Sequence, residues 1–173
     1  MAASQMPLPD RASPANVATV PLHRGARARP VIVSWTLRIA TATALGIDAV
    51  VHWQNASAYD AVRGSISQGQ LFRAEAAVAV VVGLLVLVRP RPSSWLAALL
   101  VAASALGAVL LYRYVDLGAL GPLPDLYENT WQVPGKLLSA YAEGAAVVLA
   151  GLGLLSHRTH SRSEPLPAVG SDR

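Results

Sequence analysis

Four long apolar segments decide what this chain can fold into. They cover about residues 31–53, 70–88, 95–114 and 135–155. A helix needs about 20 mainly apolar residues to cross a hydrocarbon layer of about 30 Å, and each segment meets that length. Helices also satisfy their own backbone hydrogen bonds, as a lipid environment requires. We therefore predict an all-α fold, a bundle of four transmembrane helices within residues 31–156.

Composition supports a membrane protein and excludes several kinds of site. The 173 residues are 53% hydrophobic and only 14% charged, whereas a typical soluble domain has about 25% charged residues. The mean hydropathy is +0.41. The chain has no cysteine, which excludes disulfides, thiolate metal sites and iron–sulfur clusters. Residues 1–30 and 157–173 are polar and contain proline, so we expect two disordered tails.

The distribution of basic residues predicts an orientation. Arginines collect in both tails and in the link between the second and third segments, namely Arg11, Arg24, Arg27, Arg29, Arg89, Arg91, Arg158, Arg162 and Arg173. Such segments stay on the cytoplasmic side. We therefore expect a multi-pass protein of the cell membrane with both termini in the cytoplasm. The net charge of +4 lies mostly in tails and short loops beside apolar segments, so the expected partner is the lipid bilayer and not nucleic acid. A homo-oligomer or a membrane-complex partner is left open.

Polar residues recur along the first apolar segment at steps of three and four, which places them on one helical face. They are Ser34, Arg38, Thr41, Asp48 and His52. A charge that faces lipid near the centre of a membrane helix costs about 2.5 kcal/mol or more. This polar face should therefore point into the bundle. Arg38 lies nearest the cytoplasmic end among the charged members, and we expect its guanidinium to snorkel to the headgroups.

Ionisable residues of all four segments fall at a similar depth near the outer face. They are Asp48, His52, Glu75, Arg113 and Glu143. One interpretation is an internal ion-pair network in which Arg73 and Arg113 neutralise the acids. A second is a site for a small ligand or for protons, because ionisable groups at membrane depth often serve function.

A third interpretation is a metal site formed by His52, Asp48, Glu75 and Glu143. One imidazole and several carboxylates suit zinc, manganese or iron. We rank this interpretation last, because the neighbouring arginines would oppose a cation. No cofactor is predicted.

The loop between the third and fourth segments, residues 115–136, combines Gly and Pro with acidic and aromatic residues. Trp and Tyr favour the membrane interface, so the loop could be an interfacial anchor. It could also be a lid over the ionisable layer, with Asp125, Tyr127, Glu128 and Trp131 as its candidate residues. We expect a short interfacial helix beginning near Asp125.

No enzyme motif is present in the chain. It lacks GxSxG, HExxH, the phosphate-binding GxxxxGK and a dinucleotide fingerprint. Two hypotheses about function follow. The first is a non-enzymatic membrane protein, an accessory subunit or a bundle that binds a small ligand in the outer polar layer. The alternative is a proton-coupled or redox membrane enzyme or transporter that uses the Asp/His/Glu cluster.

Several stretches together resemble a known group of proteins. They are "VVHW" before Tyr59, "GQLFRAEA", "LGPLPDLYENTW" and "KLLSAYAEG". The pattern is similar to that of small four-helix integral membrane proteins of GC-rich actinobacteria, a group without an established activity. At the level of architecture it is also similar to DoxX-like four-helix membrane proteins. The resemblance covers about residues 31–156 and implies the four-helix topology and no mechanism.

Overall fold

The computed structural model describes residues 28–161, and its regular elements there are all helical. The helices are α1 (Ala28–Ala56), α2 (Gln68–Val88), α3 (Pro92–Tyr114) and α4 (Lys136–Ser161). The all-α fold is confirmed. Most of the predicted tails, 1–30 and 157–173, lies outside the described residues, although α1 and α4 extend a few residues into them.

Three of these helices, α2, α3 and α4, are long and apolar enough to cross a membrane. The helix α1 is not among them within the described residues, since Arg38 and Asp48 lower its hydropathy. The structure thus supports a membrane protein, while a fourth span stays a prediction.

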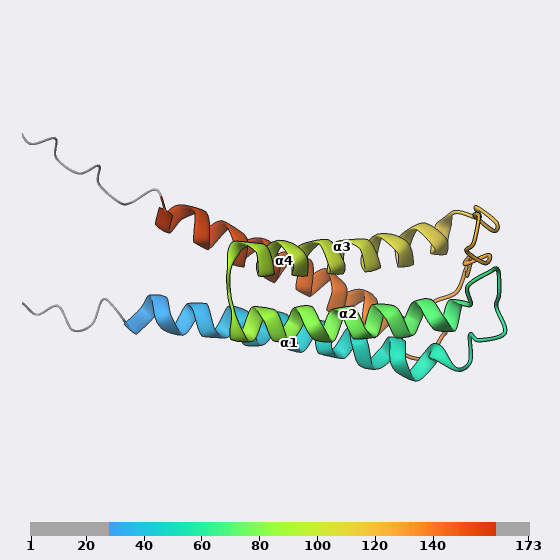
Figure 1. Ribbon diagram of the computed structural model, residues 1–173, viewed down its shortest axis with the longest axis horizontal. Helices are drawn as coiled ribbons and strands as arrows, with labels where there is room; N and C mark the ends of the chain where they lie inside the picture. The colour runs from blue at the N-terminus through green and yellow to red at the C-terminus, as the bar shows by residue number, and fades with distance from the viewer. Residues whose placement is uncertain (1–27, 162–173) are drawn as a thin grey trace, which may run out of the picture.

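The helices run alternately up and down (Figure 1). The start of α1, the end of α4 and the α2–α3 link lie at one end, which we call the tail end. The two longer loops, residues 57–67 and 115–135, lie together at the other end, the loop end. The helix α1 packs on α2 and α4, and α3 packs on α4 and less extensively on α2.

Small side chains fill the interior of the bundle and large ones cover its outside. The buried members are mostly alanines, among them Ala79, Ala98, Ala102, Ala146 and Ala150. The outward-facing residues include Val81, Val88, Leu100, Val148 and Leu152. Lipid is as apolar as leucine, so membrane helices associate by close packing of small residues and not by hiding large ones. This distribution is the one expected for a bundle with lipid around it.

The tail end is closed by one large residue. The Trp95 ring of α3 is 2% exposed and packs against Gly153 of α4, where an added Cβ would lie 2.3 Å from the ring atom Cε3. The close approach of α3 and α4 therefore depends on the missing side chain at Gly153.

Arg38 also lies toward the tail end, and the prediction that its guanidinium snorkels to the lipid headgroups is wrong. Its guanidinium is buried and donates hydrogen bonds to the carbonyl oxygens of Val86 and Leu87 in the last turn of α2. The last four carbonyls of a helix have no partner within the helix, and the helix dipole favours a cation there. Arg38 thus caps α2 from α1.

The two loops fix each other at the loop end. The backbone N–H of Ile66 donates to the carbonyl of Pro122, 3.1 Å away, and a Cβ at Gly64 would lie 2.7 Å from the same oxygen. Arg73 of α2 donates to both carboxylate oxygens of Asp60 at 2.8 and 2.7 Å. These contacts hold the first loop against the second and against the start of α2.

Candidate functional site

The predicted polar face of α1 points into the bundle over most of its length. Thr41, Leu45 and Asp48 are at most 1% exposed, and His52 is largely buried. Thr41 satisfies its hydroxyl by donating to the Leu37 carbonyl. Ser34, at the start of the face, is exposed.

Asp48 is the centre of a buried cluster between α1 and α4. Its Oδ1 accepts a hydrogen bond from the Ser139 hydroxyl at 2.6 Å and lies 2.9 Å from Nδ1 of His52. Ser139 Oγ also lies 3.0 Å from Oε1 of Glu143, one turn further along α4. Helical spacing of four residues on both α1 and α4 produces this arrangement, which joins Asp48, His52, Ser139 and Glu143.

One carboxylate oxygen of this cluster has no hydrogen-bond partner. Oε2 of Glu143 is buried and has no hydrogen-bond partner, although the residue is only 1% exposed. Buried carboxylate oxygens normally have a donor. The cluster therefore has spare acceptor capacity in a buried part of the bundle.

His52 connects the cluster to a cavity. Its Nδ1 also lies 3.1 Å from the Asp48 carbonyl, so two oxygens of Asp48 lie beside this nitrogen and orient the ring. The ring meets Phe72 edge to face, with the centroids 5.1 Å apart. His52 and Ser139 both line the cavity.

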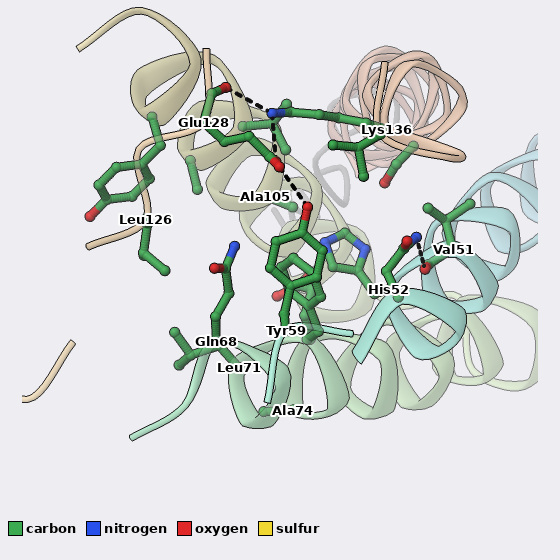
Figure 2. Close-up of a pocket in the computed structure, with 18 of the residues that line it drawn as sticks. Val51, His52, Tyr59, Gln68, Leu71, Ala74, Ala105, Leu126, Glu128 and Lys136 are labelled. Atoms are coloured by element: carbon green, nitrogen blue, oxygen red, sulfur yellow. Dashed lines mark hydrogen bonds and ion pairs between the residues drawn. The ribbon is translucent and has the colours of Figure 1, made fainter. Parts of the chain in front are cut away.

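The cavity has a volume of about 430 Å³ and lies in the loop-end half of the bundle, where residues of both loops help to line it. Figure 2 shows several of its lining residues. Apolar side chains form most of the wall, including Val51, Leu71, Phe72, Val78, Ala105, Val109 and Leu126. Half of the lining residues carry a polar group, namely His52, Asn55, Tyr59, Gln68, Glu75, Ser104, Tyr112, Glu128, Lys136 and Ser139. It lies on the side where α2 and α3 pack least extensively.

Glu75 faces this cavity and is not part of the Asp48 cluster. It lines the wall, and its Oε1 is buried without a hydrogen-bond partner. The only other carboxylate of the lining, Glu128, is already paired.

Glu128 anchors the second loop over the cavity. Its carboxylate accepts hydrogen bonds from the Tyr59 hydroxyl at 2.6 Å and from Lys136 Nζ at 2.9 Å, and both are visible in Figure 2. Burial and then the hydrogen bond to Glu128 raise the pKa of the Tyr59 phenol, which keeps its proton available for donation. Asn55 adds a hydrogen bond to the Pro134 carbonyl.

The lid residues named from sequence thus have different positions. Glu128 lines the cavity, but Asp125, Tyr127 and Trp131 do not. Asp125 accepts from the backbone N–H of Tyr127, and Trp131 lies beside the cations of Arg113 and Lys136. The expected short helix near Asp125 is wrong, because the segment is irregular. Its Glu128 instead bonds to Tyr59 of the first loop, to the Tyr112 carbonyl of α3 and to Lys136 of α4.

The proposed cations of the ion-pair network are also wrong. Arg73 pairs with Asp60, and Arg113 lies over the rings of Tyr114 and Trp131. Over residues 28–161, the ion pairs join neither arginine to Asp48, Glu75 or Glu143. Arg113 does not line the cavity either. The structure thus joins three of the five candidate residues, Asp48, His52 and Glu143, and places Glu75 on the cavity wall.

Sequence reasoning missed Asp60 and the pairing of Tyr59 with Glu128. These partners are 13 and 69 residues apart across loops, and no helical period relates them. Ser139 does carry a signal, since it precedes Glu143 by one helical turn. Comparisons of the chain with protein-family models, curated proteins and solved structures give no match.

Proposed function

We propose that this protein is a four-span protein of the cell membrane that binds a small amphipathic ligand in the loop-end cavity. The main support for this proposal is the cavity itself. Ligand sites have volumes of about 300–1,000 Å³, mostly apolar walls and a few convergent polar groups. The cavity of about 430 Å³ with its mainly apolar lining meets that description.

The distribution of side chains on α1 supports its placement as the fourth span. Its outer face carries Ile39, Ile47, Val50 and Trp53, all more than a third exposed, while its charged residues Arg38 and Asp48 are buried. Lipid would then contact neither Arg38 nor Asp48, the charged residues of α1 between positions 34 and 56. With the arginine distribution, this placement puts both termini in the cytoplasm and the loop end at the outer face. It also agrees with the resemblance to four-helix actinobacterial membrane proteins.

The lining favours a ligand with an apolar body and a cationic amine head. Glu75 offers a buried oxygen without a partner, and Lys136, the cation of the lining, is paired with Glu128. The rings of Tyr59, Phe72 and Tyr112 also line the cavity, and aromatic faces attract ammonium groups.

A thermal-shift series on the detergent-solubilised protein tests this proposal. The probes are alkyl amines of six to ten carbons, with the matching alcohols and alkyl sulfates. We expect amines to raise the unfolding temperature and sulfates to leave it unchanged. Glu75→Gln should remove the preference for amines, because the carboxylate that pairs with the ammonium is lost.

A matched pair of variants on α3 locates the binding. Ala105 is buried and lines the cavity, whereas Ala103 is exposed and does not. Ala105→Phe should abolish the amine shift, and Ala103→Phe should keep it. Equal shifts in both variants would place the probes outside the cavity and contradict the proposal.

The same protein in liposomes separates binding from the alternative function. A proton-coupled transporter would move a bound amine with a proton gradient, and a redox enzyme would turn over an electron donor. A binding bundle gives neither flux nor turnover. Cysteine labelling from each side of the membrane, at Ser57 and at Arg91, tests the orientation because the chain has no native cysteine.

A further inference from the structure

We propose that Asp48, His52 and Glu143 bind a divalent transition-metal cation, with Ser139 orienting the carboxylate of Asp48. Ligand atoms of the three residues, one from each, lie within 4.8 Å of one another. At metal–ligand distances of about 2.0–2.2 Å, the ligand atoms around one ion lie about 3.0–3.6 Å apart. Small side-chain rotations therefore bring the three groups onto one ion.

The excess of acidic groups in the cluster is the first reason, since two carboxylates share one imidazole, that of His52. Two carboxylates, Asp48 and Glu143, are each 1% exposed. The arginines that would oppose a cation lie elsewhere, Arg73 with Asp60 and Arg38 at the tail end. A buried charge without compensation is strongly unfavourable, and a divalent cation neutralises both carboxylates at once.

The hydroxyl of Ser139 gives the second reason. It has one proton, which it donates to Asp48 Oδ1 at 2.6 Å. Its other carboxylate neighbour, Glu143 Oε1 at 3.0 Å, then faces an oxygen lone pair unless a cation or an added proton lies between the acids. Glu143 Oε2, buried and without a partner, is a further acceptor left for the same ion.

The donor set selects the class of metal. One imidazole and two carboxylates suit Zn²⁺, Mn²⁺ or Fe²⁺, while Mg²⁺ and Ca²⁺ prefer oxygen ligands alone. His52 and Ser139 both line the cavity, so the remaining coordination positions would open toward it. The metal site does not depend on the amine proposal, because Glu75 is not one of the three ligands.

Metal titration of the full-length protein tests the inference. The protein is purified in detergent, stripped with a chelator and titrated with Zn²⁺, with Mg²⁺ and Ca²⁺ as controls. We expect one equivalent of Zn²⁺ to bind and to raise the unfolding temperature, and the controls to leave it unchanged. Substitution of groups that orient metal ligands costs about 10–100-fold in affinity. Ser139→Ala should therefore weaken binding within that range, and Glu143→Gln or Asp48→Asn by at least about 100-fold.

Two controls keep the outcomes distinct. Glu75→Gln should retain Zn²⁺ and lose the amine shift, whereas Glu143→Gln should lose Zn²⁺ and retain that shift. Paramagnetic resonance of Mn²⁺ with the wild-type protein needs no variant: the signal of free Mn²⁺ should fall by one equivalent. Absence of Zn²⁺ and Mn²⁺ binding at submillimolar concentration would overturn the proposal. An added proton shared by Asp48 and Glu143 would then explain the cluster. Binding that survives both Glu143→Gln and Asp48→Asn would overturn it as well.

Discussion

The two ends of the bundle differ in how completely their buried charged side chains are hydrogen-bonded. At the tail end, the Arg38 guanidinium is engaged with the α2 carbonyls and with the Trp35 ring, 3.8 Å from its centroid. At the loop end, Glu75 and Glu143 each retain a buried oxygen without a partner. Both ends place charge where it is expensive. The protein's own groups satisfy the charge of Arg38 at the tail end, whereas Glu75 and Glu143 at the loop end are not fully satisfied. This difference makes the tail end structural and the loop end the candidate site.

Replacement of Arg38 should give the largest effect on stability. Arg38→Met leaves the carbonyls of Val86 and Leu87 unpaired, and hydrogen bonds to charged groups contribute about 1.5–3 kcal/mol. Circular dichroism of the detergent-solubilised protein should show a clearly lower unfolding temperature. Arg91→Ala removes the same charge from an exposed residue at the same end and should change little.

Glu143→Gln sharpens the comparison in the metal-free protein. Because Glu143 has an unsatisfied oxygen, its replacement by an uncharged isostere should not lower the unfolding temperature. A loss as large as that of Arg38→Met would mean that the two ends do not differ, and that the loop-end acids are structural.

Substitution of Gly153 should give the next largest effect on stability. Gly153→Ala places a Cβ against the Trp95 ring, and overpacking of this kind costs about 1–3 kcal/mol. Gly151, two residues away, has open space at its Cβ position, so Gly151→Ala should be neutral or slightly stabilising. The difference between the unfolding temperatures of the two variants measures the packing of α4 against Trp95. Equal unfolding temperatures would contradict the close contact between Gly153 and the Trp95 ring.

The smallest effect is a dependence of stability on pH at the first loop. The hydrogen bonds from Arg73 hold the pKa of Asp60 below its usual value of 3.8. A lowered pKa in the folded state stabilises the protein above the usual pKa, and this stabilisation disappears as the pH falls through the lowered value. Asp60→Asn should therefore be less stable than wild type at pH 7 and equal to it in strong acid. The effect is small because both side chains are more than a third exposed.

Arg73→Lys is the control for that measurement. It keeps the charge and loses the two parallel hydrogen bonds, so it should show a weaker form of the same pH dependence. A pH dependence that persists unchanged in Asp60→Asn would assign it to other groups.

The sequence by itself determined the helical elements and the inward face of α1. Apolar length predicts helices in lipid, and a period of three to four residues predicts which face of α1 is buried. The same period relates Asp48 to His52 and Ser139 to Glu143. These are local properties, because each depends on residues within one or two turns of the same helix.

Only the tertiary structure decided the partners of the charges. Arg73 pairs with Asp60, Arg113 lies over the Trp131 ring, and Arg38 donates to carbonyls at the end of α2. An arginine side chain reaches several acceptors, and the nearest one depends on how helices and loops pack. The arginines expected to oppose a metal are therefore absent from the acidic cluster, for a reason that lies in the loops and the helix ends.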